Sequence, residues 1–330
     1  MAKMDTVRQP LSRAAGPLRL RRTLSWPGRR GYWALAILVL VVGGLGLRLV
    51  AADSAPLGLD RWLPWLNPPA VTLHFPDTED RFLVPVTRRV SSKSVNAEGA
   101  VRQLLEGPRD GVRLAAALPR DAVLDGVEVV DGRATVSINA PGEQSLDPDA
   151  AQLAADALLR TLEPFDDIRS VRLLVDGASV ADAETSLARR DLHPIYYSYG
   201  PYLVPVAEAR RSPDEALRAY LSGVGADPGL VGLPSDVRLI GYRLDAGRGL
   251  AYTSFTFTDS LRDFAVGDPD GVRRALTGIV AMLTSYPEVT AVMLDFEGRA
   301  RLGLGQCSDM LRAPQLEPGA LNDEAVAMRR

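Results

Sequence analysis

The spacing of apolar residues predicts short strands and an amphipathic helix after residue 70. Residues 71–75 and 82–86 are short apolar runs separated by polar turn residues, which is the pattern of two strands. From residue 97 to residue 105 the apolar side chains recur at helical spacing, with Asn96 as a candidate N-cap. The first part of the chain is therefore expected to fold as strand, strand, helix.

The pattern continues with a hairpin, a second helix and a closing strand. Residues 123–138 alternate between apolar and polar positions on either side of Asp131-Gly132, a pair that favours a tight two-residue turn. Asp147 is placed to cap a helix that has Pro148 in its first position. Residues 171–177 then form an apolar strand. The predicted order of this unit is ββαββαβ.

This unit occurs twice in the chain. Leu83-Val84-Pro85-Val86 recurs letter for letter at Leu203-Val204-Pro205-Val206, and Asp147-Pro148-Asp149 recurs as Asp268-Pro269-Asp270. The order of matches is kept and the offset varies by only a few residues, as differences in loop length would produce. The second copy is predicted to have strands at 194–198, 202–206, 237–244, 250–257 and 292–298, and helices starting at a Ser212–Glu215 capping box and at Pro269. Each copy is expected to be a two-layer α+β domain, with two helices against one mixed or largely antiparallel sheet.

The residues before the first copy predict a membrane anchor. An uncharged run from Tyr32 continues past Arg48 to Ala52, and its 21 residues match a hydrocarbon core about 30 Å thick. Cleavage after the small residues at 51–55 is the alternative interpretation. Residues 1–30 carry eight basic residues and one acidic residue, a net charge of +7, which places them in the cytoplasm by the positive-inside rule.

Three tryptophans lie at one end of the predicted span or beyond the other. Trp33, Trp62 and Trp65 suit the membrane interface, where amphipathic rings settle. A hydrophobic contact of Trp62 and Trp65 with the first domain is an equally valid interpretation.

Composition excludes several classes of function. The 300 residues after the tail hold 30 basic and 40 acidic residues, a net charge of −10, which argues against nucleic acid as a partner. A single cysteine, Cys307, excludes an internal disulfide and is expected to be an incidental free thiol in a polar stretch. We predict no nucleic-acid partner.

No residue pattern indicates catalysis. His74 and His193 are the only histidines, and we interpret them as strand side chains far apart in separate domains rather than as paired ligands. The acidic pairs at 147/149 and 268/270 are helix caps rather than calcium ligands, and Asp166-Asp167 lacks further ligands. The chain contains neither a Gly-x-Ser-x-Gly motif nor a phosphate-binding loop. We therefore predict a non-enzyme with no catalytic, metal-binding or cofactor-binding residues.

Two features are candidates for an interaction surface. Pro85 and Pro205 each remove an amide donor, so their strands are expected to lie at sheet edges, where a partner strand can pair. A cluster of tyrosines in the second copy resembles an aromatic platform for a glycan, although alternation along a strand would bury part of it: Tyr196, Tyr197, Tyr199 and Tyr202. Residues 259–268 form either an interaction loop or a solvated connection.

Several motifs together resemble the GerMN domain of sporulation and spore germination proteins. They are the Phe-Leu-Val-Pro-Val strand at 82–86, the Leu-Leu-Glu-Gly-Pro helix end at 104–108 and the Asp-Gly-Arg-Ala-Thr-Val hairpin at 131–136. The resemblance covers roughly residues 70–180 and, more loosely, 193–300. It implies a fold similar to the ring-building motifs of sporulation secretion complexes and supplies no catalytic residues. The second copy departs from the pattern, because "SGVGADPG" stands where Gly-Pro would end its first helix.

The sequence therefore predicts a single-pass membrane protein whose tandem domains lie outside the cytoplasm. They would act through contacts with envelope or sporulation-complex proteins or through self-association, in sporulation, germination or cell-envelope assembly. The alternative is a peptidoglycan- or glycan-binding module, or a regulator of cell-wall enzymes. The predicted organisation is a basic cytoplasmic tail (1–30), a transmembrane helix (31–52), a juxtamembrane linker rich in Pro and Trp (53–70), a first domain (71–180), a linker (181–192), a second domain (193–300) and a flexible C-terminal tail (301–330).

Overall fold

The computed structural model describes residues 69–324, apart from 142–145, 166–167, 186–191, 209–211, 224–228 and 298–303. The predicted transmembrane helix at 31–52, with Trp33, Trp62 and Trp65, lies outside these residues. Within the part of the chain that is described, no helix combines the length and the apolar composition needed to span a bilayer.

The first copy contains every element that its sequence pattern predicts, and two more. Its elements in order are β1 (Ala70–Pro76), β2 (Leu83–Arg89), the short 3₁₀ helix η2 (Ser92–Ser94), α2 (Ala97–Leu105), β3 (Val123–Val130), β4 (Arg133–Asn139), α3 (Pro148–Leu162), β5 (Ser170–Val175) and β6 (Ala178–Glu184). The additional elements are η2 and the strand β6. The linker predicted to begin at residue 181 is therefore wrong for residues 181–184, which pair with β5.

Local chemistry explains where these elements begin and turn. The Asn96 side chain accepts a hydrogen bond of 2.7 Å from the Gly99 N–H, which satisfies a free amide in the first turn of α2. Asp131 and Gly132, between β3 and β4, have φ angles of 51° and 77°. Two consecutive positive φ angles are what a type I′ turn requires, so the hairpin prediction is confirmed.

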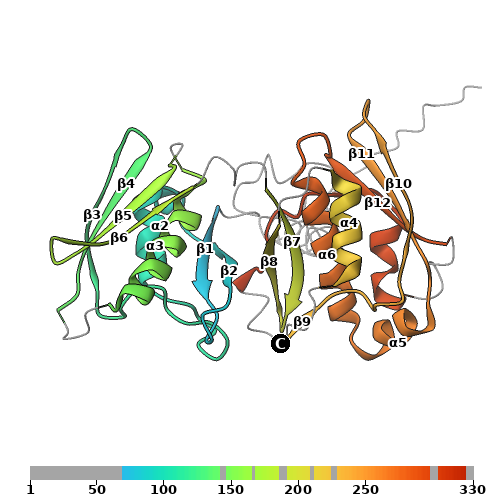
Figure 1. Ribbon diagram of the computed structural model, residues 1–330, viewed down its shortest axis with the longest axis horizontal. Helices are drawn as coiled ribbons and strands as arrows, with labels where there is room; N and C mark the ends of the chain where they lie inside the picture. The colour runs from blue at the N-terminus through green and yellow to red at the C-terminus, as the bar shows by residue number, and fades with distance from the viewer. Residues whose placement is uncertain are drawn as a thin grey trace, which may run out of the picture. The chain divides into compact units, whose positions relative to one another are not determined.

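The strands of the first copy form two sheets, where a single sheet was expected. β1 and β2 pair only with each other, whereas β3, β4, β5 and β6 form a mixed sheet in that order, with β4 and β5 parallel. Helices α2 and α3 pack against β1 on one side and against the four-stranded sheet on the other (Figure 1). The copy thus has three layers, because each helix has apolar residues facing both sheets.

The second copy follows the same plan with insertions. Its elements are β7 (His193–Tyr199), β8 (Tyr202–Glu208), α4 (Pro213–Ser222), the short β9 (Leu230–Val231), β10 (Leu239–Asp245), β11 (Leu250–Phe255), α5 (Asp259–Gly267), α6 (Pro269–Thr284) and β12 (Ala291–Phe296). One sheet has the order β8-β7-β9, and the other has β10-β11-β12-β13, where β13 is Gln315–Leu316. Helices α4 and α6 contact β7 on one side, and α4 contacts β10 and α6 contacts β12 on the other (Figure 1).

Two local predictions for the second copy are corrected. Residues 259–267 form helix α5, neither an interaction loop nor a solvated connection, with Thr258 capping it and Leu261 and Ala265 buried. Ser212 precedes α4, but its side chain makes no capping hydrogen bond, so the predicted capping box does not form. Proline at the first helical position still fixes the start of α4.

The prediction of a flexible tail over residues 301–330 is wrong for residues 304–324. This segment forms the 3₁₀ helix η4 (Gly305–Leu311) and the strand β13 (Gln315–Leu316), which pairs antiparallel with β12. Leu304, Cys307, Met310 and Leu311 belong to the core of the second copy. Leu304, Cys307 and Leu311 stand at i, i+3 and i+7, a short helical spacing that the prediction of a flexible tail overlooked.

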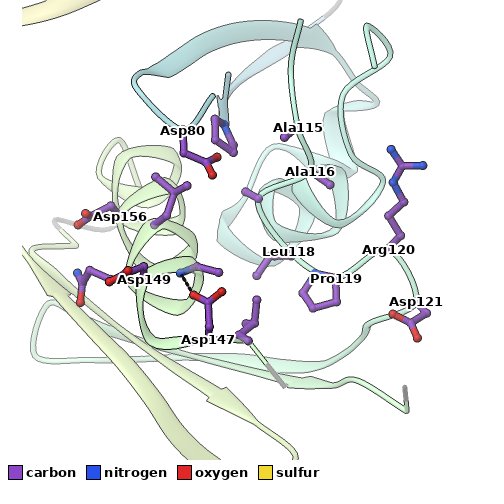
Figure 2. Close-up of a pocket in the computed structure, with 16 residues that line it drawn as sticks. Asp80, Ala115, Ala116, Leu118, Pro119, Arg120, Asp121, Asp147, Asp149 and Asp156 are labelled. Atoms are coloured by element: carbon purple, nitrogen blue, oxygen red, sulfur yellow. Dashed lines mark hydrogen bonds between the residues drawn. The ribbon is translucent and has the colours of Figure 1, made fainter. Parts of the chain in front are cut away.

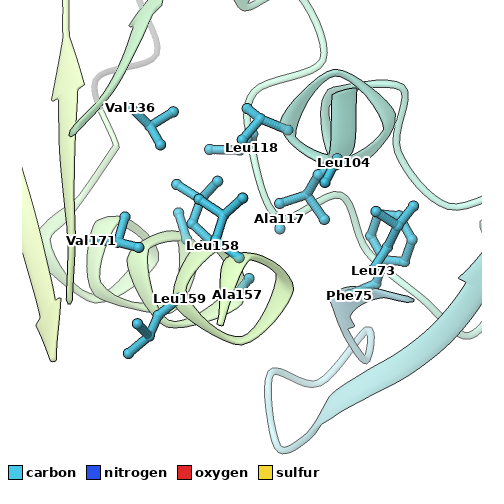
Figure 3. Packing of buried hydrophobic residues seen from close by; sticks show 14 of the residues in the cluster. Leu73, Phe75, Leu104, Ala117, Leu118, Val136, Ala157, Leu158, Leu159 and Val171 are labelled. Carbon is cyan, nitrogen blue, oxygen red and sulfur yellow. The ribbon is translucent and has the colours of Figure 1, made fainter. Parts of the chain in front are cut away.

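Each copy has its own hydrophobic core between its two sheets. In the first copy, residues from β1, α2, α3, β4 and β5 meet around Leu158 of α3 (Figure 3). Tyr202 and Val204 of β8 also belong to that core, although they lie in the second copy. Residues from Pro68 onward form one compact unit, which is consistent with this shared packing.

Candidate functional site

The four tyrosines predicted as an aromatic platform do not form one surface. Tyr197 is buried and stacks on Tyr220, with ring centroids 5.0 Å apart and its hydroxyl donating to the Tyr220 carbonyl. Tyr202 is 1% exposed and donates to the Asp110 carboxylate at 2.8 Å. Because these two rings are buried, the predicted glycan platform is not present.

The other two tyrosines are partly buried in different surroundings. Tyr199 lies near the Phe82 ring, at a centroid distance of 5.9 Å, and the Arg81 guanidinium lies 5.4 Å from the Tyr199 centroid. Tyr196 lines a cavity between the two copies. Burial raises the pKa of Tyr196 to about 12, with the charge of Glu317 adding to the shift and that of Arg160 opposing it.

Pro85 and Pro205 both lie in edge strands, as predicted. Among the strands that the structure describes, β2 pairs only with β1, and β8 pairs only with β7. Pro85 pairs with His74 across the β1–β2 hairpin, and Pro205 pairs with Tyr196 across the β7–β8 hairpin. The Pro85 carbonyl accepts a hydrogen bond from Asn322 on the side away from β1. In an antiparallel ladder the N–H and C=O of one residue face the same side, so the donor that proline lacks would also face away from β1. The hairpin therefore keeps its own hydrogen bonds.

Residues 321–324 of the same chain pair with the outer edges of β2 and β8, the edges that face away from β1 and β7. The Asn322 side chain donates to the carbonyls of Pro85 (2.6 Å) and Leu203 (2.7 Å) and accepts from the Leu203 N–H (2.7 Å). The Asn322 carbonyl accepts from the Thr87 N–H at 3.2 Å, and Thr87 pairs with Asp323 in a parallel bridge. These edges are thus a pairing surface, and residues 321–324 already pair with them.

A buried ion pair fixes the same segment. Arg88 is 1% exposed and forms a two-pronged contact with Glu324, with Nε–Oε2 at 2.7 Å and Nη2–Oε1 at 2.8 Å. The remaining Arg88 donors reach the carbonyls of Gln103 and Gly107. Burial alone would raise the pKa of Glu324, but the hydrogen bonds and charges of Arg88 and Arg109 hold it below its usual value. Sequence reasoning missed this contact, because the two partners are 236 residues apart and a lone Arg or Glu carries no pairing signal.

An acidic groove lies beside the start of α3 in the first copy (Figure 2). Its volume is about 1520 Å³. The carboxylates of Asp147, Asp149 and Asp156 lie along the helix, and the loop from Ala115 to Asp121 forms the other wall. Asp147 accepts a hydrogen bond from the Ala150 N–H at 2.8 Å, so it acts as a helix cap. The groove presents negative charge beside apolar surface and contains no paired nucleophile and base.

The acidic pairs at the two helix starts have the structural role predicted for them. In the second copy, Asp268 caps α6 through the Gly271 N–H at 2.7 Å, as Asp147 does for α3. Among the described residues, no group of three His, Cys, Asp or Glu side chains is placed to hold a metal ion. Asp166-Asp167 lies outside those residues.

The two histidines are closer than expected. His74 of β1 and His193 of β7 line the same cavity between the two copies, so the prediction that they lie far apart is wrong. Both histidines lie in strands as predicted, but the packing of β7 and β8 near the first copy has no local sequence signal.

Cys307 is a core residue, where an incidental thiol in a polar stretch was expected. It is fully buried in η4, and its Sγ lies 3.2 Å from the Pro269 carbonyl oxygen. Burial raises the pKa of the Cys307 thiol, which keeps it protonated and unreactive.

These features define a class of protein: a tandem α+β protein with two similar three-layer domains. Residues 321–324, the C-terminal clasp, connect the two domains through Asn322 and Glu324. The family model "Germane: Sporulation and spore germination" matches residues 72–181 and again residues 194–301. The chain therefore belongs to the Germane family, with one Germane (GerMN) domain in each copy, and the resemblance read from its motifs is confirmed.

One solved structure agrees with this assignment at the level of fold. The tandem GerMN domains of the sporulation protein GerM from Bacillus subtilis are 19% identical, with a TM-score of 0.54, and the match covers 77% of this chain and 99% of that one. A crystal structure of a Clostridium perfringens protein is 17% identical over 35% of this chain and 87% of that one, with a TM-score of 0.25. A comparison with curated proteins found no match.

Proposed function

We propose that this chain is a membrane-anchored protein whose Germane domains lie outside the cytoplasm and act through protein–protein contacts. The process would be sporulation, spore germination or cell-envelope assembly. The family assignment over both copies supports the process. The basic tail and apolar run before residue 53 support the anchor.

The observation that carries the proposal is the joining of the two Germane domains into one unit. Asn322 bonds to strands of both copies, and Tyr202 and Val204 of the second copy are buried in the core of the first. Two domains held in a fixed relation present one composite surface, and a preorganised surface binds a partner at a lower cost in conformational entropy. This arrangement suits a scaffold or docking protein.

Photo-crosslinking in cells tests the proposed contacts. A crosslinking amino acid at Val112, Val266 or Leu316 would leave the cores intact, since these side chains are 84%, 79% and 71% exposed. We expect a discrete crosslinked product, with an envelope protein or a second copy, from at least one position and not from all three. Identical diffuse labelling from every position would contradict a specific contact, as would hydrolysis of purified peptidoglycan by the full chain.

Membrane anchoring is tested separately. The full chain should remain with membranes after alkaline carbonate extraction, and protease added outside intact cells should digest the Germane domains. Release of the chain by carbonate would contradict the anchor without bearing on the domain contacts. A soluble fragment for such work should extend to at least residue 324, because residues 304–324 are part of the fold.

Peptidoglycan binding stays a prediction with weaker support. Its sequence argument was the tyrosine cluster, and burial of Tyr197 and Tyr202 removes half of that cluster. Sedimentation of the chain with purified cell-wall material tests it directly. Retention of the chain by the wall would favour this alternative over contacts with proteins.

A further inference from the structure

The C-terminal clasp, residues 321–324, lies against the outer edges of β2 and β8. These two strands contact each other, and in the described part of the chain each has a single strand partner, β1 or β7. Their outer edges therefore keep backbone groups available for a further segment. The clasp supplies that segment, because Asp323 forms a parallel bridge with Thr87 of β2 and Asn322 bonds to Leu203 of β8.

The contacts of the clasp with these edges select particular residues at particular positions. The Asn322 side chain donates to carbonyls of both strands and accepts from the Leu203 N–H, a combination that needs an amide group. Glu324, two residues later, is 3% exposed and accepts from the buried Arg88 guanidinium through both carboxylate oxygens. The Arg109 N–H also donates to Glu324, at 3.0 Å. The edges therefore recognise a short segment in which asparagine is followed two residues later by glutamate.

The charges on the two sides of this contact are complementary. Arg88 and Arg89 of β2 form ion pairs with Glu324 and Asp323 of the clasp, at 2.7 Å and 3.1 Å. A clasp that left without a replacement would deprive the buried Arg88 of Glu324. The remaining ion-pair partner of Arg88 in the described chain would be Glu106, an exposed carboxylate 3.6 Å away. Because an incompletely paired buried charge is costly, replacement of one clasp by another is favoured over an empty site.

A short link, residues 317–320, joins the clasp to the rest of the second copy. The link follows β13 and contains neither helix nor strand. Three of its four residues are exposed, namely Glu317, Gly319 and Ala320. The chain before the link is held in the second copy by the burial of η4 and the pairing of β13 with β12. Rotation about a few link residues therefore repositions the clasp without disturbing that core.

We propose that the clasp of one molecule also binds the β2 and β8 edges of a second molecule of this chain, in exchange for the clasp already there. The exchange replaces each hydrogen bond and ion pair with an equivalent one, so little is lost when it occurs. The proposed membrane anchor would confine the molecules to one plane and raise the local concentration that drives the exchange. This inference rests on the proposed function and deepens it, because it names the partner as a second molecule and the surface as the β2 and β8 edges.

Cysteine crosslinking of the full chain tests the exchange, because the single native cysteine, Cys307, is fully buried. Arg89→Cys marks the β2 edge and Asp323→Cys marks the clasp, at two side chains that lie 3.1 Å apart. A short bis-maleimide should link the two cysteines within the double variant, which shows that the reagent spans the contact. When the two single variants share the same lipid vesicles, we expect a linked dimer with one chain of each kind, whose yield rises with protein concentration. Absence of this dimer at every concentration, beside efficient linking within the double variant, would overturn the proposal.

Clasp substitutions give the exchange a direction that accidental proximity lacks. Asn322→Ala/Glu324→Gln in the chain that carries Arg89→Cys weakens that chain's own clasp and frees its edges, so the yield of linked dimer should rise about threefold. The same substitutions in the chain that carries Asp323→Cys should lower the yield about tenfold, because that clasp no longer has its amide and its buried carboxylate. Equal yields from these two mixtures would contradict the exchange.

A matched control separates exchange from collision between molecules. Val266→Cys presents an exposed cysteine on α5 and, mixed with Asp323→Cys, should give no linked dimer above background. A yield equal to that of the Arg89→Cys mixture would overturn the proposal. Circular dichroism verifies that each variant is folded, and the mixture of single variants stays decisive if the clasp variant does not fold. Loss of the exchange while the photo-crosslinks described above persist would contradict this inference alone, whereas loss of both would also contradict the proposed protein contacts.

Discussion

At the scale of single residues, Asn322 connects the two copies directly. Its side chain makes three hydrogen bonds, to Pro85 in one copy and to both backbone groups of Leu203 in the other. Its φ angle is 55°, in the left-handed region that asparagine tolerates better than most residues. No other common side chain offers a donor pair, an acceptor and this backbone freedom together.

We therefore expect Asn322→Ala to destabilise the protein by about 2–4 kcal/mol, because it leaves the Leu203 N–H and two carbonyls unpaired. Urea unfolding of the full chain measures the change. Asn139→Ala is the control, since the exposed Asn139 side chain makes only a surface bond to Asp125 and its loss should cost less than about 0.5 kcal/mol. Equal losses in the two variants would contradict the bridging role of Asn322.

His74 predicts how stability depends on pH. Its pKa is lowered to about 3 in the folded state, chiefly by burial, from 6.5 in the unfolded state. Between these values the unfolded chain binds more protons, so stability is full above about pH 6.5 and falls as the pH decreases towards 3. The His74 side chain is partly exposed although its Nδ1 is buried, so we expect a loss of only about 1–2 kcal/mol between pH 6.5 and 4.5.

The His74→Gln variant isolates this contribution. Glutamine stays neutral at every pH, so the stability of the variant should change less between pH 6.5 and 4.5 than that of the unmodified chain. Unfolding free energies from urea titrations at several pH values measure the difference. Parallel pH profiles for the two proteins would show that His74 does not bind a proton on unfolding in this range.

At the scale of elements, α5 shows where the second copy has diverged from the first. The first copy has no helix between β4 and α3 among its described residues, whereas the second inserts nine residues of helix between β11 and α6. Leu261 of α5 is fully buried, and Val266 of the same helix is 79% exposed. The helix is therefore packed on one face and open on the other.

A pair of substitutions in α5 tests this packing. Leu261→Ala should destabilise the protein by about 2–4 kcal/mol, because it removes a fully buried side chain and leaves a cavity. Val266→Ala should change stability by less than about 0.5 kcal/mol. Thermal unfolding of both variants measures the contrast. A small effect of Leu261→Ala would mean that the packing of α5 contributes little to the stability of the second copy.

Elements with a regular apolar stripe and a cap could be predicted from the sequence. Helices α2, α3 and α6 begin at the predicted Asn96, Asp147 and Asp268 caps because those signals are local. The separation of β1–β2 from the four-stranded sheet could not be predicted, because alternation shows which residues face a core but not which strands share hydrogen bonds. The same limit applies to η4, whose burial depends on contacts with a distant α6.

The candidate sites divide in the same way, into features with a local sequence signal and features formed only by tertiary contacts. Pro85 and Pro205 correctly marked edge strands, because a missing amide donor restricts a residue wherever it occurs. The occupant of those edges, residues 321–324, lies more than 230 residues from β2 in sequence and carries no pairing motif. The cavity between the two copies was missed for a related reason: its walls come from β1, α3 and β7, which only tertiary packing brings together.

At the scale of the whole molecule, the two Germane copies are coupled by covalent continuity and by the clasp. The Arg88–Glu324 pair and the Asn322 bonds connect the C-terminal segment to the first copy, while η4 and β13 tie the same segment to the second. The first core also contains Tyr202 and Val204 of the second copy. Unfolding either copy would therefore expose apolar surface and break buried hydrogen bonds of the other.

We accordingly expect the Germane region to unfold in one cooperative transition, with equal calorimetric and van't Hoff enthalpies. Breaking the clasp with the double variant Asn322→Ala/Glu324→Gln should separate this into two transitions, because each copy keeps its own core while the hydrogen bonds and the ion pair that couple the copies are lost. Scanning calorimetry of the full chain measures both. The control Asn139→Ala/Glu98→Gln alters two exposed surface contacts and should keep a single transition. Two transitions in the unmodified chain would mean that the copies fold independently and that the clasp contributes little coupling.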